Sequence, residues 1–224
     1  MKRIIFMLMI AVLITACNPL QSDECNALKG ETNADNCYFE KAISTADAVL
    51  CENIKMDQLK GSCISEIGIA LNDIRLCESL DNTTKGYCYA KIAINNEDET
   101  ICESIDSTYW IDICYSELGK AKNDAELCLK VDIRYADACF VEVAESTQDE
   151  GVCRWITDND DKYFCYRDLA LSKEDVTICN NIADDVWRDG NCIKKYAEVA
   201  DDPEICETIG LVKIKEHCLE KFKE

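Results

Sequence analysis

The chain has 224 residues, and 48% of them are hydrophobic, which is enough for a substantial core. Its 17 cysteines against two prolines are typical of a disulfide scaffold in a protein that leaves the reducing cytosol. The formal net charge of −20 disfavours nucleic acid as a partner and any close approach to anionic lipid.

The first residues have the pattern of an export signal. Residues 1–3 are a short basic segment, and residues 4–13 are an apolar run too short to span a bilayer. The next four residues, ITAC, end at Cys17 and resemble the lipobox of bacterial-type membrane lipoproteins. The resemblance implies a signal peptide over residues 1–16, cleavage before Cys17 and lipidation of Cys17. The alternative is an ordinary secretory signal in which Cys17 is incidental.

The lipobox resemblance also predicts the organisation and location of the mature chain. Residues 17–24 would be a lipidated tether, and residues 25–224 a single cysteine-rich helical repeat domain. The protein would lie in the cell envelope, lipid-anchored on the outer face of a membrane. Because Lys2 and Arg3 leave with the signal, the body becomes still more acidic, so the lipid alone would hold it there.

The other sixteen cysteines form a periodic series. Their separations alternate between 11 to 13 residues and a constant 14, so that the period is about 26 residues, as in solenoids and arrays. We call the first cysteine of each unit early and the second late. The series is Cys25, Cys37, Cys51, Cys63, Cys77, Cys88, Cys102, Cys114, Cys128, Cys139, Cys153, Cys165, Cys179, Cys192, Cys206 and Cys218.

Apolar residues follow each late cysteine with helical spacing. After Cys114 come Tyr115, Leu118 and the small residue Gly119, all on one face of a helix. A small residue stands at this last position in the first seven units, and we expect it to let a neighbouring helix approach closely. Each unit is predicted to be a short helix of about two turns, a loop of variable length and a helix of about three turns.

The predicted fold is therefore an all-α, right-handed α-solenoid of helical hairpins, each stapled by a disulfide. It is similar in plan to secreted cysteine-rich relatives of the tetratricopeptide-like solenoids. The period is shorter than theirs and their signature residues are missing, so no functional residue is carried over.

An aspartate stands ten residues after the late cysteine in every unit that has this position. Each aspartate precedes a short apolar segment, which is the signal of a helix N-cap. The alternative is a ligand-binding row of carboxylates. The aspartates are Asp47, Asp73, Asp98, Asp124, Asp149, Asp175 and Asp202.

Helix geometry ranks the possible disulfides. Across the shorter gap the loop lies midway between the two cysteines, so an antiparallel hairpin brings them level. Across the gap of 14 residues the turn is off-centre, and this pairing would leave Cys25 and Cys218 unused. The predicted bridges are 25–37, 51–63, 77–88, 102–114, 128–139, 153–165, 179–192 and 206–218.

No motif for catalysis or metal binding stands out. The chain has no C-x-x-C pair, and its one histidine, His217, is expected on a solvated helix. The segment Asp158-Asn159-Asp160-Asp161 faintly resembles a calcium loop, but we favour a plain solvated loop. We therefore expect no enzyme, no cofactor and no metal site.

The three tryptophans have two possible roles, as packing residues or as anchors for a partner. Trp110 and Trp187 fall in the variable loops, and Trp155 follows an early cysteine. Packing against neighbouring hairpins is favoured, and anchoring of a partner is the alternative. The expected function is a protein-interaction scaffold whose acidic surface binds a protein or a cationic peptide. The alternatives are an envelope enzyme or metal-handling protein, and a structural spacer.

Overall fold

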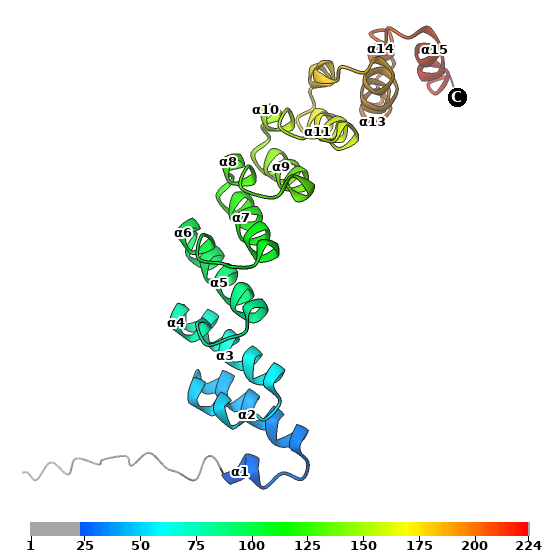
Figure 1. Cartoon of the computed structure of the whole chain (residues 1–224). Helices are drawn as coiled ribbons and strands as arrows, with labels where there is room; N and C mark the ends of the chain where they lie inside the picture. The colour runs from blue at the N-terminus through cyan, green and yellow to red at the C-terminus, as the bar shows by residue number, and fades with distance from the viewer. Residues whose placement is uncertain (1–22, 224) are drawn as a thin grey trace, which may run out of the picture. The chain divides into compact units, whose positions relative to one another are not determined.

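A computed structural model describes residues 23–223, so the signal and Cys17 lie outside the described residues. Every regular element between residues 23 and 223 is a helix (Figure 1). The chain divides into two compact units, residues 1–67 and residues 68–224, and each unit is described by itself. The fold is all-α, as the helical spacing of the apolar residues predicts.

The first unit contains α1 (Asp23–Asn26), α2 (Glu31–Thr45), the 3₁₀-helix η2 (Ala48–Asn53) and most of α3 (Asp57–Leu71), which continues into the second unit. The second unit then contains α4 (Ile74–Cys77), α5 (Asn82–Asn96), α6 (Glu99–Cys102), α7 (Thr108–Lys122), α8 (Ala125–Cys128), α9 (Ile133–Thr147), α10 (Glu150–Cys153), α11 (Asn159–Ser172), the 3₁₀-helix η3 (Val176–Asn181), α12 (Asp185–Trp187), the π-helical η4 (Arg188–Ile193), α13 (Lys194–Ala200), α14 (Pro203–Cys206) and α15 (Val212–Glu220).

Short and long helices alternate, and each pair forms one cysteine unit. Helices such as α6 and α8 have four residues, whereas α5, α7 and α9 have 15. These lengths are about one and about four turns, against the predicted two and three. Of the short helices in residues 23–223, only the six-residue 3₁₀-helices η2 and η3 make the predicted two turns. The long helix exceeds the predicted length because it begins several residues before its late cysteine: Cys114 lies in the middle of α7.

Successive hairpins repeat the same arrangement. In the second compact unit, residues 68–224, the short helices α4, α6, α8 and α10 follow one another along one side. The long helices α5, α7, α9 and α11 follow one another along the other side (Figure 1). The chain is thus an α-solenoid of disulfide-stapled units with regular spacing. The right-handed twist stays a prediction.

The unit with the widest cysteine separation absorbs its extra residue inside a helix. Cys179 and Cys192 are 13 residues apart, against 12 for Cys153 and Cys165. The long helix here runs through α12, the π-helical turn η4 and α13. A π turn closes around one more residue than an α turn, so Cys192 stays fully buried despite the insertion.

The core consists of the periodic positions named above. In the unit that begins at Cys102, the buried residues include Cys114, Tyr115 and Leu118, together with Ile105 from the segment after the short helix. The same positions are buried in the neighbouring units of the second part of the chain. The predicted stripe is therefore the face on which the hairpins stack.

The long helices share one kind of C-terminus. Asp124 donates its backbone N–H to the carbonyl of Gly119 at 2.8 Å, which is a Schellman-type ending. A Cβ on Gly119 would lie 3.2 Å from Sγ of Cys139 and 3.3 Å from Sγ of Cys128. The small residue therefore makes room for the disulfide of the following unit. The residue before the aspartate is left-handed in each unit: Ala46, Asn72, Glu97, Asn123, Gln148, Glu174 and Asp201.

Candidate partner-binding surface

Each unit has one disulfide between its early and its late cysteine. The Cα–Cα distances are 5.5 to 5.9 Å, within the usual range for a bridge. Eight bridges indicate an oxidising, extracytoplasmic environment. The pairs are those expected from the spacing: Cys25–Cys37, Cys51–Cys63, Cys77–Cys88, Cys102–Cys114, Cys128–Cys139, Cys153–Cys165, Cys179–Cys192 and Cys206–Cys218.

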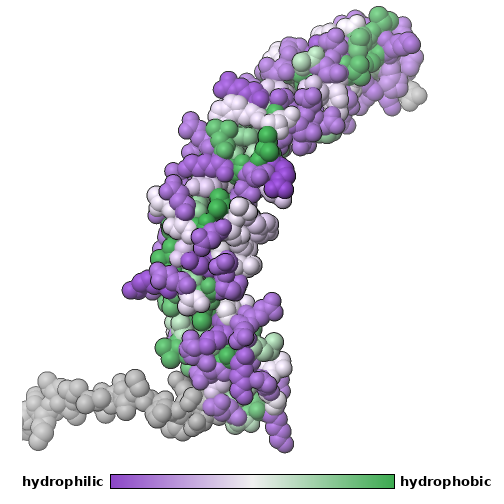
Figure 2. Space-filling model, in the orientation of Figure 1, coloured by the Kyte–Doolittle hydropathy of each residue, from purple (hydrophilic) through white to green (hydrophobic). Residues whose placement is uncertain are grey.

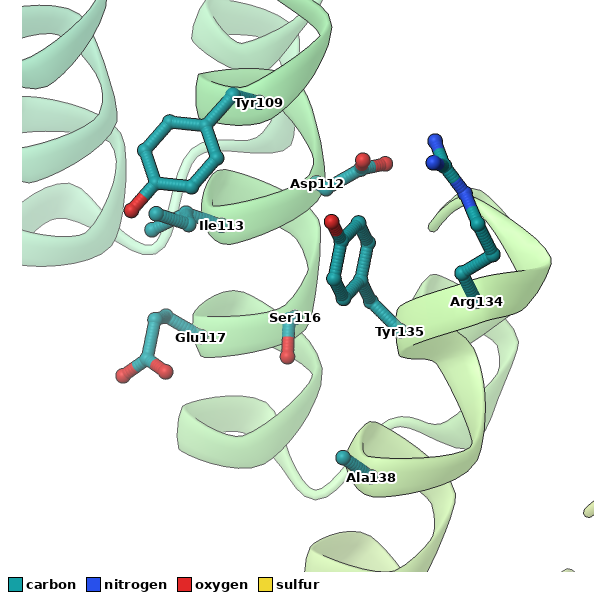
Figure 3. A pocket seen from close by; sticks show the side chains of 8 residues that line it. All are labelled: Tyr109, Asp112, Ile113, Ser116, Glu117, Arg134, Tyr135 and Ala138. Atoms are coloured by element: carbon teal, nitrogen blue, oxygen red, sulfur yellow. The ribbon is translucent and has the colours of Figure 1, made fainter.

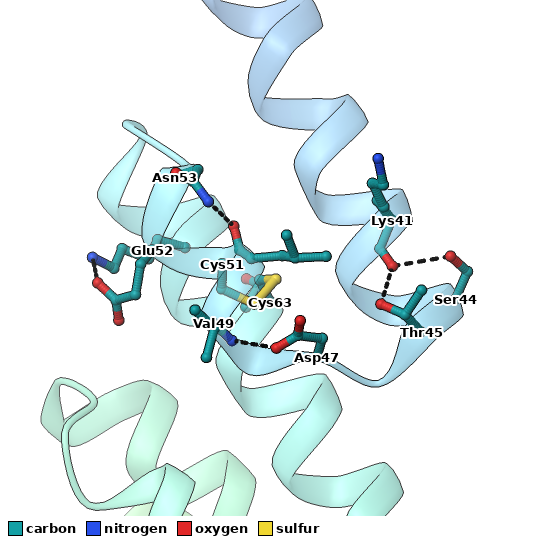
Figure 4. Close-up of a disulfide and its surroundings, with 12 residues drawn as sticks. Lys41, Ser44, Thr45, Asp47, Val49, Cys51, Glu52, Asn53 and Cys63 are labelled. Carbon is teal, nitrogen blue, oxygen red and sulfur yellow. Dashed lines mark hydrogen bonds and ion pairs between the residues drawn. A yellow bond between two sulfur atoms is a disulfide. The ribbon is translucent and has the colours of Figure 1, made fainter. Parts of the chain in front are cut away.

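The seven periodic aspartates all lie at N-caps. Figure 4 shows Asp47 beside the Cys51–Cys63 bridge, accepting a hydrogen bond from the N–H of Val49 at 3.0 Å. The other six accept in the same way from the N–H two residues further on. These aspartates are Asp73, Asp98, Asp124, Asp149, Asp175 and Asp202.

Several of these carboxyl groups are held in the ionised state. The hydroxyl of Thr100, together with its backbone N–H, lowers the pKa of Asp98. The side chain and N–H of Thr177 lower the pKa of Asp175 in the same way. These carboxylates therefore already accept hydrogen bonds from the backbone N–H groups at the start of the short helices. Between residues 23 and 223 no group of three or more histidine, cysteine or acidic side chains is placed to hold a metal ion.

The acidic segment that begins at Asp158 is a helix start and not a loop. Asp158 accepts hydrogen bonds from the backbone N–H groups of Asp160 and Asp161 at 2.9 and 3.1 Å. α11 begins at the next residue. Aspartate at an N-cap and acidic residues in a first turn are the ordinary composition of a helix N-terminus.

A second set of aspartates joins one unit to the next, and the cysteine repeat does not predict it. Asp137 of α9 accepts hydrogen bonds from the backbone N–H groups of Thr157 and Asp158, at 2.9 and 2.8 Å, just before α11 begins. Asp35 does the same for residues 55 and 56, and Asp189 for residues 210 and 211. An aspartate of one long helix therefore accepts hydrogen bonds from the backbone just before the following long helix begins.

The positions of these unit-joining aspartates relative to the late cysteines form a partial pattern in the sequence. Asp112 belongs to the same set, because it accepts the backbone N–H of Asp132 at 2.8 Å. Asp35, Asp112 and Asp137 each stand two residues before a late cysteine, and Asp189 stands three before Cys192, where the π turn adds a residue. Asp35 and Asp189 are only 1% exposed. Three other units have Gly61, Gly86 or Tyr163 at this position, and the last unit has Glu216, which is why the aspartate does not appear as periodic.

Trp110 packs between neighbouring units and does not project freely. It lies in the first turn of α7, and not in a loop as expected. A Cβ on Gly86 would come within 2.5 Å of its indole, so the glycine makes room for the ring. Its ring centroid is 5.4 Å from that of Tyr87 and 5.1 Å from that of Tyr109.

The other two tryptophans are also half-buried against the core. The ring of Trp155 lies 5.7 Å from that of Phe140 in an edge-to-face contact. Trp187 is the last residue of α12 and does not lie in a loop as expected. Its ring centroid lies 5.0 Å from that of Phe164. All three tryptophans thus contact neighbouring elements, as the packing hypothesis expects. Their role as partner anchors remains a prediction.

The surface between α7 and α9 contains a cavity of about 220 Å³. In Figure 3 the ring of Tyr135 reaches from α9 toward α7 and lies beside Asp112, while Tyr109 and Ile113 project on the other side of α7 in this view. Tyr109 and Tyr135 are 59% and 52% exposed. The lining residues are Tyr109, Asp112, Ile113, Ser116, Glu117, Arg134, Tyr135 and Ala138.

Two cations near this cavity are engaged by carboxylates. Arg134 donates from Nε to Oδ1 of Asp132 at 2.9 Å and from Nη2 to Oδ2 at 3.3 Å. Its side-chain hydrogen bonds lower the pKa of Asp132. Lys120 lies 2.8 Å from Glu142 and 3.1 Å from Glu117. Burial opposes the charge of Lys120, but these two partners outweigh it and raise its pKa.

The exposed surface is mainly hydrophilic. Figure 2 shows hydrophilic residues over most of the visible face, with small hydrophobic patches between them. Acidic residues outnumber lysine and arginine by 44 to 24 in the whole chain. Among residues 23–223, none of the helices has the length and apolar character that a bilayer span requires.

Comparison of the chain with protein-family models, with curated proteins and with solved structures finds no significant match.

Proposed function

We propose that the chain is an extracytoplasmic lipoprotein, anchored through Cys17 on the outer face of a membrane, that acts as a protein-interaction scaffold. Its acidic surface would bind a basic protein or a cationic peptide. The single observation that carries this proposal is that the periodic residues of the repeat and its variable surface residues have different roles. The periodic residues are buried or used as caps, and the surface that varies from unit to unit is acidic.

Solenoids expose extended surfaces on a frame in which each unit contacts only its neighbours. A bridge in every unit would hold such a surface in one conformation, so that less entropy is lost on binding. The excess of carboxylates would steer a basic partner and accelerate association at low salt. These features support a binding role more than they support the alternative of a passive spacer.

The binding proposal is tested by cross-linking the full chain in the membrane on which it resides and identifying the attached proteins by mass spectrometry. We expect one or a few basic proteins, whose recovery falls as salt is raised before cross-linking. A matched sample with an unrelated acidic lipoprotein controls for adventitious attachment. Recovery of the same proteins with both baits, or of none, would contradict the proposal and favour the spacer.

The anchoring proposal is tested separately with Cys17→Ser. Without the thiol no lipid can be attached, so we expect the variant to leave the membrane fraction while the unaltered chain remains in it. Ser22→Ala, in the proposed tether, is the matched control and should fractionate like the unaltered chain. A Cys17→Ser variant that stays in the membrane fraction would contradict lipid anchoring.

A further inference from the structure

The cavity between α7 and α9 has the composition expected of a site for a cationic side chain. Two exposed tyrosine rings, Tyr109 and Tyr135, line it together with the apolar side chains of Ile113 and Ala138 (Figure 3). Aromatic faces attract ammonium and guanidinium groups, and tyrosine is enriched where binding energy is concentrated. The apolar side chains suit the methylene stem of lysine or arginine.

The charges around the cavity leave carboxylates in excess. Arg134 is held by Asp132, and Lys120 alone serves both Glu117 and Glu142. Asp112 accepts the backbone N–H of Asp132 at 2.8 Å from Oδ1, and among the described residues no cation forms an ion pair with it within 4 Å, although the charge of Arg134 acts on it from further away. A guest cation would therefore meet a net negative rim.

The chain already places its own cations on tyrosine rings nearby. Lys130 Nζ lies 4.8 Å from the ring centroid of Tyr115. The guanidinium carbon of Arg134 lies 5.5 Å from the ring centroid of Tyr135. The geometry of helices α7 and α9 is therefore compatible with cation–ring contacts at this surface.

We propose that this cavity binds a lysine or arginine side chain from an extended, basic segment of a partner protein. The inference rests on the proposed function and gives that function a place on the molecule. Charge complementarity selects the occupant, because the rim is acidic and the lining is aromatic. A second copy of this strongly acidic chain would bring like charge to the rim.

Binding is measured by fluorescence anisotropy with a fluorescein-labelled hexa-arginine peptide and the full chain, oxidised, at physiological salt. The test variant carries Tyr109→Leu and Tyr135→Leu, which keep the net charge and apolar bulk but remove both rings. We expect the peptide to bind the variant at least about tenfold more weakly than the unaltered chain. Phe164→Leu is the matched control, because Phe164 is a partly exposed aromatic residue outside the cavity.

A second measurement locates the peptide directly. Amide chemical-shift changes on titration with unlabelled hexa-arginine should concentrate in the first two turns of α7 and α9. The same spectra show whether the double variant keeps its fold, so a loss of binding through unfolding is recognised. Shift changes spread evenly over the acidic surface would overturn the assignment to this cavity.

The outcomes separate this inference from the proposed function. Equal affinity of the double variant and the unaltered chain would overturn the cavity site while leaving an acidic binding surface in place. Failure of the unaltered chain to bind the peptide would also overturn the cavity site. The cross-linking experiment decides the proposed function independently, because it does not depend on this peptide or on either tyrosine.

Discussion

Single residues at the ends of the long helices hold a backbone conformation that most side chains disfavour. Ala46, at the end of α2, has φ 52° and ψ 37°. For a residue with a Cβ this left-handed conformation costs about 1–2 kcal/mol, whereas glycine adopts it freely. The tight turn is needed so that the next residue, Asp47, can cap the short helix that follows.

We therefore expect Ala46→Gly to stabilise the fold. The relief of left-handed strain exceeds the extra entropy that glycine loses on folding, and the net gain should be about 0.5–1 kcal/mol. Ala121→Gly is the control, because Ala121 is exposed in the ordinary helical backbone of α7, where glycine should destabilise by a similar amount. Urea unfolding with the disulfides intact measures both. A loss of stability in Ala46→Gly would contradict the account.

The carboxylate of Asp137 is expected to hold two units in register. Asp137→Ala leaves the N–H groups of Thr157 and Asp158 without their acceptor in a site that is largely buried, and should lower the free energy of unfolding by about 1–3 kcal/mol. Hydrogen exchange at these two amides should accelerate. Glu145→Ala, on the exposed side of the same helix, should stay within about 0.5 kcal/mol.

Residues that repeat were readily predicted, and residues that vary were not. The pairing of Cys102 with Cys114 and the cap at Asp98 follow from spacing, because the same local geometry recurs in every unit. The contact of Asp137 with residues 157 and 158 crosses 20 or more positions and is absent from several units. The place of Trp110 depends on Gly86 in the preceding unit, which no local pattern reveals.

At the scale of an element, the short helices cannot stand alone. A four-residue helix such as α6 has one turn and depends on its cap, its bridge and its neighbours. The bridge between Cys102 and Cys114 ties this turn to the middle of α7. The prediction of two turns for this helix was wrong, because the spacing of cysteines and apolar residues indicates where a helix lies better than where it begins and ends.

Removal of one bridge tests its contribution. The double substitution Cys102→Ala and Cys114→Ala should lower the free energy of unfolding by about 2–4 kcal/mol, because the unfolded chain loses the constraint on a loop of 12 residues. Thermal unfolding of the oxidised proteins measures the loss. The unaltered chain after full reduction should lose its cooperative transition. A double variant as stable as the unaltered chain would contradict a stabilising role for the staple.

The caps predict how stability depends on pH. The pKa of Asp98 is lowered by Thr100, that of Asp175 by Thr177, and that of Glu150 by Lys173. A carboxyl group with a lowered pKa stabilises the fold above its unfolded value, about 4, and the contribution is lost as pH falls through the folded value. The melting temperature should therefore be steady near neutrality and decline below about pH 4.

Thr100→Val gives this prediction a local readout. The variant removes the hydroxyl that contributes most to the lowered pKa of Asp98. A carboxyl titration by NMR should show the pKa of Asp98 moving upward toward its ordinary value, while that of Asp175 stays unchanged. If both carboxyl groups titrate as in the unaltered chain, the cap does not depend on the hydroxyl.

At the scale of the whole molecule, the chain combines a stapled helical frame with an excess of surface carboxylates. The frame explains the unusual cysteine content, since neither helix of a hairpin is long enough to be stable without its partner. The acidic charge disfavours contact with anionic lipid, so the proposed lipid at Cys17 would have to provide the membrane attachment by itself. The protein is thus an oxidised solenoid for which we propose a lipid anchor at Cys17.

Native mass spectrometry of the protein, extracted from its own membrane without reductant, tests this central claim most directly. We expect a mature chain that begins at Cys17, carries lipid on that residue and has the other sixteen cysteines oxidised in eight bridges. Digestion of the same sample should return only bridges between the early and late cysteine of one unit. Free thiols in the repeat, bridges between units, or a chain without lipid at Cys17 would contradict it.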